Sequence, residues 1–494
     1  MLTDLSWLSE GERFPPSSEK ERLEMYEMNR NLFECKHVEV YEESLKRIER
    51  VIGNFQQIIS YPVILNFQKL ISLKTADLLL GETPQISAGE KGSPEQDTID
   101  EIIESSDLFN TCYQNVIDIS RYGDGLFYVR DEDGGLIDLT QPPIWFPIVS
   151  PDNVRCKLFH VLAWTYETGV QEKRKKYLKV QIHSKGEYIE RVHLLNGCYI
   201  GKMTEKEKTV KTGLDDFAIV QIPNTITSDR ATGIDDYTDV DSIIAELMVR
   251  VGQIARILDK HASPSMSGPL TALERDPATG EWRLKAANYF PRDQKDDPDV
   301  TYITWDGQLT ANFTQIDKLI NFLYTISEMG AAIFGDMSNQ TGQIASGSAL
   351  RRLMVSPLAK VSRIRTRFDA GLKKALVLCS QLGGDSIMDL SDTVINITWA
   401  DGLPEDPLEQ AQIMQIRTGN KPTMSQISAI KKMDDMDDEG ADEELAKILD
   451  DEAAMNPLRA PVYTPPVKPT DTSNPLDTTK PMDETMKPDI TAVK

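Results

Sequence analysis

The chain has 494 residues, of which 40% are hydrophobic, and its 54 basic and 78 acidic side chains give a formal net charge of −24. Such a charge repels nucleic acid over most of a surface, which argues against a sequence-reading DNA binder but not against a surface past which DNA slides. No run approaches the roughly 18 unbroken apolar residues of a membrane span, so we expect a water-soluble, cytoplasmic chain without a membrane partner.

Motifs for catalysis or cofactor binding are incomplete in this sequence. The five cysteines are far apart and the five histidines show no ligand spacing beside them, so we expect reduced thiols and no structural metal. Gly123 to Gly125 is not followed by a phosphate-binding loop, and Ala345 to Ala349 lacks the nucleophile elbow of a hydrolase. The sequence therefore predicts a protein that is not an enzyme, with no catalytic residue and no cofactor.

The first part of the chain reads as helices. Residues 1–60 are charged and helical in pattern. The segment Tyr61 to Gly81 is apolar nearly all round, has a proline near its start and ends in glycine, which predicts a buried helix. Ser87 to Pro94 reads as a glycine-bearing loop, and Asp97 to Tyr122 as another helix.

From Leu126 the pattern alternates as strands do. Leu126 to Arg130 and Leu136 to Leu139 flank Asp133 and Gly134, which predicts a hairpin. Five more strands are predicted, at Ile144 to Val149, Val161 to Tyr166, Tyr177 to His183, Glu187 to Leu194 and Phe217 to Ile222. Residues 61–232 thus predict an α+β domain of helices followed by an antiparallel meander.

Two long helices with an insert between them follow. Gly233 to Asp239 opens the first helix, whose N-terminal turns hold four acids counting Asp241, where the helix dipole favours them. Residues 263–311 contain five prolines and two candidate strands, which indicates a small β-rich module. The second helix is expected from Thr314, whose hydroxyl would cap it, to about Gly330.

A polar loop and a long basic helix come next. Asp336 to Gly347 is rich in residues that tolerate turns, which predicts a mobile loop. A helix is expected from Ser348, with Pro357 kinking it. Its bases leave two readings open: an ordinary solvated face, or contacts with acids of a neighbouring subunit or with phosphates. Eight bases stand against the single acid Asp369, a balance of 8 minus 1, or +7: Arg351, Arg352, Lys360, Arg363, Arg365, Arg367, Lys373 and Lys374.

The last hundred or so residues are polar. A strand is predicted at Val394 to Trp399, with short helices starting near Leu408 and Thr423. Asp434 to Glu452 holds eleven acids and is expected to be a solvated surface, since its spacing misses the EF-hand pattern. Residues 456–494 contain eight prolines and one aromatic residue, which predicts disorder.

The order of these parts resembles the portal proteins of tailed bacteriophages, particularly those of long-tailed phages. The resemblance spans residues from about 55 to about 455 and rests on order and spacing rather than on one motif. The matching stretches are Tyr61 to Gly81, Gly123 to Arg130 before the hairpin, Gly233 to Asp239, Phe334 and Gly335, Ser346 to Leu350, and Ile397 to Pro404.

The resemblance implies a portal-like α+β fold, with a wing, long stem helices, a β-rich clip and a helical crown. After an N-terminal helical segment (1–60), the implied order is wing (61–232), stem helix (233–262), clip (263–311), second stem helix (312–332), tunnel loop (333–347), long kinked helix between wing and crown (348–384), crown (385–455) and disordered tail (456–494).

The resemblance also implies partners: a ring of twelve subunits, double-stranded DNA passing without sequence specificity, terminase, head–tail adaptors, and capsid and scaffolding proteins. The implied location of the protein is the portal vertex of a virion that is assembled in the host cytoplasm. Acids at Asp235 to Asp241 and bases at Arg351 to Lys374 would then form complementary faces between subunits. The alternatives are a non-viral assembling scaffold or adaptor and a metal-dependent DNA-processing enzyme.

Three groups of site residues follow from the resemblance. The tunnel loop would touch DNA through Asp336, Ser338, Asn339, Gln340, Thr341, Gln343 and Ser346. The subunit interface or channel would use Arg351, Arg352, Lys360, Arg363 and Arg367. The clip would dock the motor and adaptors through Glu274, Arg283 and Lys285.

Overall fold

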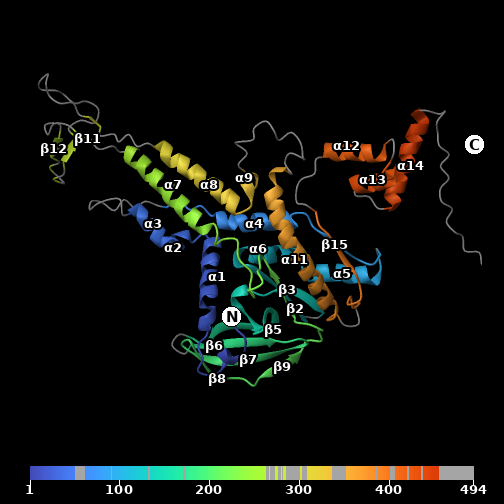
Figure 1. Cartoon of the computed structure of the whole chain (residues 1–494), viewed down its shortest axis with the longest axis horizontal. Coiled ribbons are helices and arrows are strands. Elements are labelled where there is room, and N and C mark those ends of the chain that lie inside the picture. Colours follow the sequence, from blue (N-terminus) through green and yellow to red (C-terminus); the bar gives the residue numbers. More distant parts are fainter. Residues whose placement is uncertain are drawn as a thin grey trace, which may run out of the picture. The chain divides into compact units, whose positions relative to one another are not determined.

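A computed structural model describes residues 1–49, 62–90, 92–131, 134–170, 174–262, 309–335, 352–383, 387–400, 407–419, 422–434 and 438–455, with short pieces between 266 and 302. Contacts divide the chain into two units, Met1–Glu405 and Asp406–Lys494. The larger unit combines helices with antiparallel sheets, which confirms the predicted α+β class (Figure 1).

The largest sheet is antiparallel and has the order β4-β5-β6-β7-β8, with β9 paired to β7. Its strands are β4 Trp145–Ser150, β5 Asn153–Thr168, β6 Lys175–His183, β7 Glu187–Asn196, β8 Tyr199–Met203 and β9 Lys208–Lys211. The first four coincide with predicted strands. The N-terminal segment packs Leu2, Trp7 and Leu8 against the apolar side chains of this sheet.

A second sheet carries the predicted hairpin. Its order is β10-β2-β3, with β2 at Asp124–Asp131, β3 at Gly135–Leu139 and β10 at Ile219–Pro223. Val129 lies opposite Ile137, so the register carries apolar side chains across the pair. Both residues are buried in the main core, which also takes side chains from α4, α5, α6 and α11.

The helices of the N-terminal half differ from the prediction at their ends. The segment predicted as one helix from Tyr61 begins only at Phe67, because the Asn66 side chain accepts the Lys69 amide and caps α4 (Phe67–Leu80). The helix predicted over Asp97 to Tyr122 is two helices, α5 (Pro94–Ser105) and α6 (Leu108–Tyr122). Asp107 between them has a φ of 42°, a left-handed conformation that a continuous helix excludes.

Of the other described helices before α4, only α1 is as long as α4. They are η1 Ser6–Leu8, η2 Ser17–Glu19, α1 Lys20–Phe33, α2 His37–Val40 and α3 Glu42–Glu49, and η3 (Pro142–Ile144) precedes β4.

One strand pair joins segments that are far apart in the sequence. The predicted strand near Val394 is β15 (Ile395–Thr398), and it pairs with β1 (Gln85–Ala88). Ser87 and Ala88 of β1 fall within the segment predicted as a loop, because a strand of four residues gives too short an alternating pattern. The contact-based boundary of the larger unit accordingly falls after Glu405, beyond this strand.

The two long helices lie side by side (Figure 1). The first, α7, is Asp241–Ala262 and starts later than predicted, so only Asp241 of the four acids lies in its first turn. The second, α8, is Leu309–Ile326 and starts earlier. Thr314 therefore lies inside α8 and donates its hydroxyl to the Thr310 carbonyl instead of capping the helix.

Between α7 and α8 the described strands form two short antiparallel pairs. They are β11 (Met266–Ser267) with β14 (Thr301–Tyr302) and β12 (Leu273–Arg275) with β13 (Trp282–Leu284). These four strands lie within residues 263–311, for which a small β-rich module was predicted.

The long basic helix is not one kinked helix. After α9 (Gly330–Ile333), a helical stretch is interrupted at Met354, and α11 runs from Val355 to Ser380. Pro357 lies in the first turn of α11, where a backbone N–H has no partner in the helix, so the proline fits a helix start and does not kink a continuous helix.

The smaller unit has three described helices: α12 Pro407–Thr418, α13 Gln426–Asp434 and α14 Asp438–Met455. In the described part of the chain, no helix is both long enough and apolar enough to cross a membrane.

Candidate functional site at the base of the two long helices

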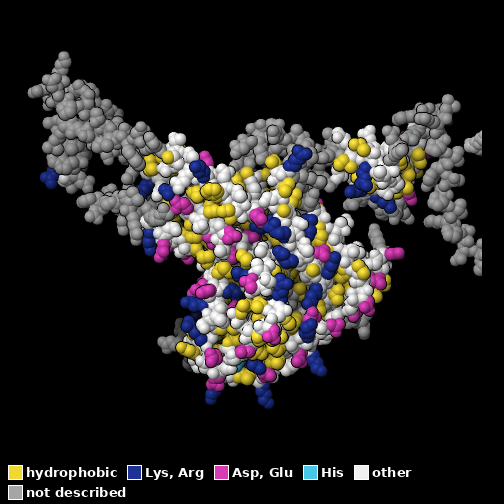
Figure 2. Space-filling model, viewed as in Figure 1, with side chains coloured by type: hydrophobic (Ala, Val, Ile, Leu, Met, Phe, Trp, Pro, Cys, Tyr) yellow, Lys and Arg dark blue, Asp and Glu magenta, His cyan; other side chains and the backbone are white. Residues whose placement is uncertain are grey.

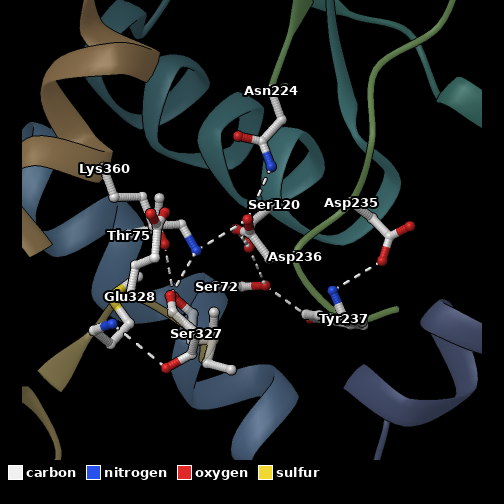
Figure 3. Close-up of polar contacts among 12 residues, drawn as sticks. Ser72, Thr75, Ser120, Asn224, Asp235, Asp236, Tyr237, Ser327, Glu328 and Lys360 are labelled. Carbon is white, nitrogen blue, oxygen red and sulfur yellow. Dashed lines mark hydrogen bonds and ion pairs between the residues drawn. The ribbon is translucent and has the colours of Figure 1, made fainter. Parts of the chain in front are cut away.

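Lys360 is buried where α11 passes the end of α8. Its ammonium lies 3.0 Å from a carboxylate oxygen of Asp236 and donates to the Ser327 carbonyl at 3.2 Å. Only 8% of each of the two charged side chains is exposed. A buried pair of this kind is costly to break, because removing one partner leaves an uncompensated charge. Figure 3 shows the pair and the residues around it.

Asp236 is also the end of a chain of hydroxyl groups. Ser72 donates to Ser120 at 3.0 Å, and Ser120 donates to the second carboxylate oxygen of Asp236 at 2.7 Å. Because the Ser72 hydrogen is used, the Tyr237 hydroxyl, 2.7 Å away, is the donor to Ser72. Burial raises the pKa of Tyr237, so its hydroxyl keeps its proton. Asn224 donates to Asp236 at 2.9 Å.

The same region contains two glycine motifs that carried the resemblance. Gly123 ends α6 and lies against Gly233, and a Cβ on Gly233 would collide with the Gly123 carbonyl. The Gly233 amide donates to both carboxylate oxygens of Asp124, at 3.0 and 3.1 Å. Burial raises the pKa of Asp124 to about 6. The two motifs therefore form one backbone contact, which only glycine permits.

The turn after α8 is held by α11. Glu328 has a φ of 59°, unusual for a residue with a side chain, and its carboxylate pairs with Arg363. Lys360, one turn earlier on α11, takes the adjacent Ser327 carbonyl. Arg367 donates to the Pro223 carbonyl at 3.0 Å and to the Asn224 carbonyl. Lys360, Arg363 and Arg367 of α11 thus bind the residues that follow α8 and the end of β10.

These contacts correct the idea that acids at Asp235 to Asp241 meet bases of a neighbouring subunit. Asp236 pairs with Lys360 of its own chain. The Asp235 carboxylate accepts the amides of Tyr237 and Thr238. Asp241 accepts hydrogen bonds from Tyr41 and Gln68, and burial raises its pKa to about 6. Asp235, Asp236 and Asp241 therefore face inward, whereas Asp239 is exposed.

The remaining predicted site residues are placed as follows. Glu274 and Arg283 lie opposite each other in the β12–β13 pair. Arg352 is exposed at the helical stretch before α11. The expected DNA-contacting loop, Asp336 to Ser346, lies outside the described residues, as do Lys285 and Arg351.

Sequence reasoning missed the polar residues around the Lys360–Asp236 pair, namely Ser72, Ser120, Asn224 and Tyr237. A signal was present, because Ser72 lies beside apolar residues on the buried face of α4, and a buried hydroxyl needs a hydrogen-bond partner. The partners are more than 40 residues away in sequence, so the pattern could not name them.

The arrangement is a buried polar network. It connects α4, α6, the segment before α7, the end of α8 and α11 through charged and hydroxyl groups. No group of three or more His, Cys, Asp and Glu side chains in the described ranges is close enough to hold a metal ion.

Comparison with known proteins gives a family match and loose structural likenesses. The family described as "Phage portal protein, SPP1 Gp6-like" matches residues 20–457. No curated protein matches the chain. A chain in the virion of a native gene transfer agent (GTA) particle is 13% identical, with a TM-score of 0.42, over 79% of this chain and 92% of that one.

Two neck structures are similar to the same degree. A chain in the neck of a native GTA particle, computed with C12 symmetry, is 14% identical with a TM-score of 0.40, over 74% of this chain and 89% of that one. For the neck of an empty particle, computed with C6 symmetry, the values are 14%, 0.42, 79% and 93%. Because the family match covers well over half of the sequence, this chain belongs to the SPP1 Gp6-like family of phage portal proteins.

Proposed function

We propose that this portal protein forms a closed ring, of twelve subunits, at one vertex of a virion, and that DNA passes through its channel during packaging and ejection. The observation that carries the proposal is the family match, which runs from residue 20 to residue 457. The net charge of −24 favours it, since an acidic lumen would give passing DNA little to bind.

Within this ring, residues 61–232 are the wing, α7 and α8 the stem, residues 263–311 the clip and residues 385–455 the crown. The proposal for the clip rests on position, because this segment connects the far ends of two adjacent helices. We assign the docking of terminase, and later of head–tail adaptors, to this segment, with Glu274, Arg283 and Lys285 as contacts. The capsid and scaffolding proteins would contact the ring during assembly in the host cytoplasm.

Residues 336–346 form the tunnel loop in this proposal. They offer neutral hydrogen-bonding side chains and the single charge of Asp336, so they can meet phosphates without the affinity that a lysine cluster would bring. The double substitution of Gln340 and Gln343 by lysine is expected to slow packaging at low salt, with partial recovery as ionic strength rises.

The matched control replaces Gln85 and Ser87, exposed residues of β1, with lysine. This control adds the same charge at another place and should package normally. Equal packaging rates for the loop variant and the wild type across a salt series, in intact rings, would contradict the lumen assignment.

Electron microscopy of the purified protein tests the ring itself. The expected images are closed rings with an axial hole. A population of monomers and dimers at every protein and salt concentration would refute the proposal. Assembly of another symmetry would favour the scaffold alternative, and metal-dependent DNA cleavage would favour the enzyme.

A further inference from the structure

Helix α5 presents an acidic face without cations. Its twelve residues include Glu95 and four exposed acids that lie within about one third of the helix circumference, but no lysine or arginine. These four are the α5 acidic face: Asp97, Asp100, Glu101 and Glu104. None of them forms a salt bridge with another part of the chain that the structure describes.

This arrangement is unfavourable in an isolated subunit. Asp97 and Glu101, and likewise Asp100 and Glu104, are like charges four residues apart, which destabilise a helix by a few tenths of a kcal/mol per pair. Glu104 also lies in the last turn, where the helix dipole disfavours a negative charge. The helix cannot turn its acids away, because Ile99 and Ile102 are fully buried in the core.

Helix α11 presents the opposite charge. Arg363, Arg367 and Lys374 follow one stripe of the helix, at spacings of four and seven residues, and Lys185 is joined to Lys374 through Asp216. We call these four residues the α11 basic face. The carboxylates paired with it are Glu328 and Asp216, which leaves 4 minus 2, or +2.

The cations of this face crowd one another as the acids of α5 do. Burial, and after it the charge of Arg363, lowers the pKa of Arg367. Arg363 and Lys374 keep 51% and 43% of their side chains exposed although each is already paired. Both faces therefore have charge that a contact of opposite sign would relieve.

The α11 basic face and the α5 acidic face lie on different sides of helix α11. Arg367 contacts the carbonyls that follow β10. Asp369, about 200° further round the helix, accepts the Trp399 indole N–H just after β15. On that flank β15 pairs with β1, and α5 donates from Gln96 to the Ile86 carbonyl of β1. Figure 2 shows carboxylates gathered around α5 and basic side chains over α11.

We propose that the α5 acidic face of one subunit docks on the α11 basic face of the next copy, a head-to-tail contact that closes the ring. A patch of one sign on one flank and its complement on another is what a heterologous interface requires. The inference rests on the ring proposed above and adds which surfaces form it.

Charge reversal on the full-length chain tests the contact. One variant carries Glu101→Lys and Glu104→Lys, and a second carries Arg363→Glu and Lys374→Glu. Each alone should need about tenfold or more protein to form rings, measured by mass photometry at low salt, because like charges then face each other across the contact. The control, Glu10→Lys with Glu12→Lys, makes the same charge change as the first variant at exposed N-terminal positions and should assemble as wild type.

Mixing the two variants gives the decisive result. In an equimolar mixture, each variant finds an opposite face on the other, so rings with alternating subunits and an even subunit number should reappear. Thermal unfolding of each variant, with a midpoint close to wild type, shows that lost assembly is not lost folding.

The outcomes separate this inference from the ring proposal. Suppose that the wild type forms rings. If both variants then assemble normally, or if mixing them restores no rings, the α5–α11 contact is overturned but the ring proposal stands. A wild type that never forms rings would overturn both. Normal assembly of the α11 variant with reduced DNA retention would assign the basic face to nucleic acid and also overturn the contact.

Discussion

The buried ion pair between Lys360 and Asp236 makes the sharpest prediction for stability. Lys360→Met keeps the aliphatic stem and removes the ammonium, so the Asp236 carboxylate keeps its bonds to Ser120 and Asn224 but loses its countercharge. The Ser327 carbonyl loses its lysine donor as well. Breaking a buried pair from one side costs about 3–5 kcal/mol, and we expect a loss of unfolding free energy in that range.

The matched control is Lys374→Met. Lys374 pairs with Asp216 at 2.7 Å on the same helix, but 43% of the lysine side chain is exposed. Exposed pairs contribute about 0–1 kcal/mol, so this variant should unfold nearly as wild type does. Urea unfolding under conditions that keep the chain monomeric measures both, with hydrogen exchange of the turn at Glu328 as a local probe.

A double-mutant cycle then isolates the pair. Lys360→Met leaves the Asp236 carboxylate buried without a countercharge, and Asp236→Asn removes that carboxylate charge. The double variant should therefore lose less unfolding free energy than the sum of the two single variants, by about 1–3 kcal/mol. Strict additivity, or a loss for Lys360→Met no larger than for Lys374→Met, would refute the argument that burial makes this pair important.

Two further predictions concern His183 in β6 and Gly233 between β10 and α7. Burial lowers the pKa of His183 to about 4, and neither of its ring nitrogens has a hydrogen-bond partner in the described ranges. The unfolded chain therefore takes up the proton first, and the stability that depends on a neutral His183 is lost as pH falls below about 6.5, by about 2 kcal/mol at pH 5. His183→Phe should remove this dependence. Gly233→Ala should destabilise the chain by more than about 3 kcal/mol, because its Cβ would lie only 1.9 Å from the backbone carbonyl oxygen of Gly123.

The measurements are urea midpoints at pH 7.5 and pH 5 for His183→Phe, each compared with wild type at the same pH. The buried carboxyl groups, whose raised pKa values act in the opposite direction, cancel in that comparison. An unchanged pH dependence would contradict the first prediction. A soluble Gly233→Ala variant with wild-type stability would contradict the second.

Local patterns in the sequence determined much of the fold. The β2–β3 hairpin and the strands β4 to β7 of the main sheet were predictable, because alternation and turn residues act over a few neighbouring positions. The portal family was also predictable, because the resemblance rested on the order and spacing of such elements, and the family match confirms it. Element ends were less predictable. Asn66 and Asp107 set them through a side-chain cap and a left-handed backbone, which apolar spacing does not reveal.

Only the tertiary structure decided which charges meet. The sequence placed acids before α7 and bases on α11, but it could not say that Asp236 and Lys360 pair inside one chain. Nor could it show that β1 pairs with β15, or that Pro357 begins a helix. Charge and hydrophobicity are properties of single positions, whereas an ion pair depends on the distance between two positions. That distance is fixed by core packing between α4, α6 and α11. These helices are far apart in the sequence, so a pattern within one segment does not reveal how they pack.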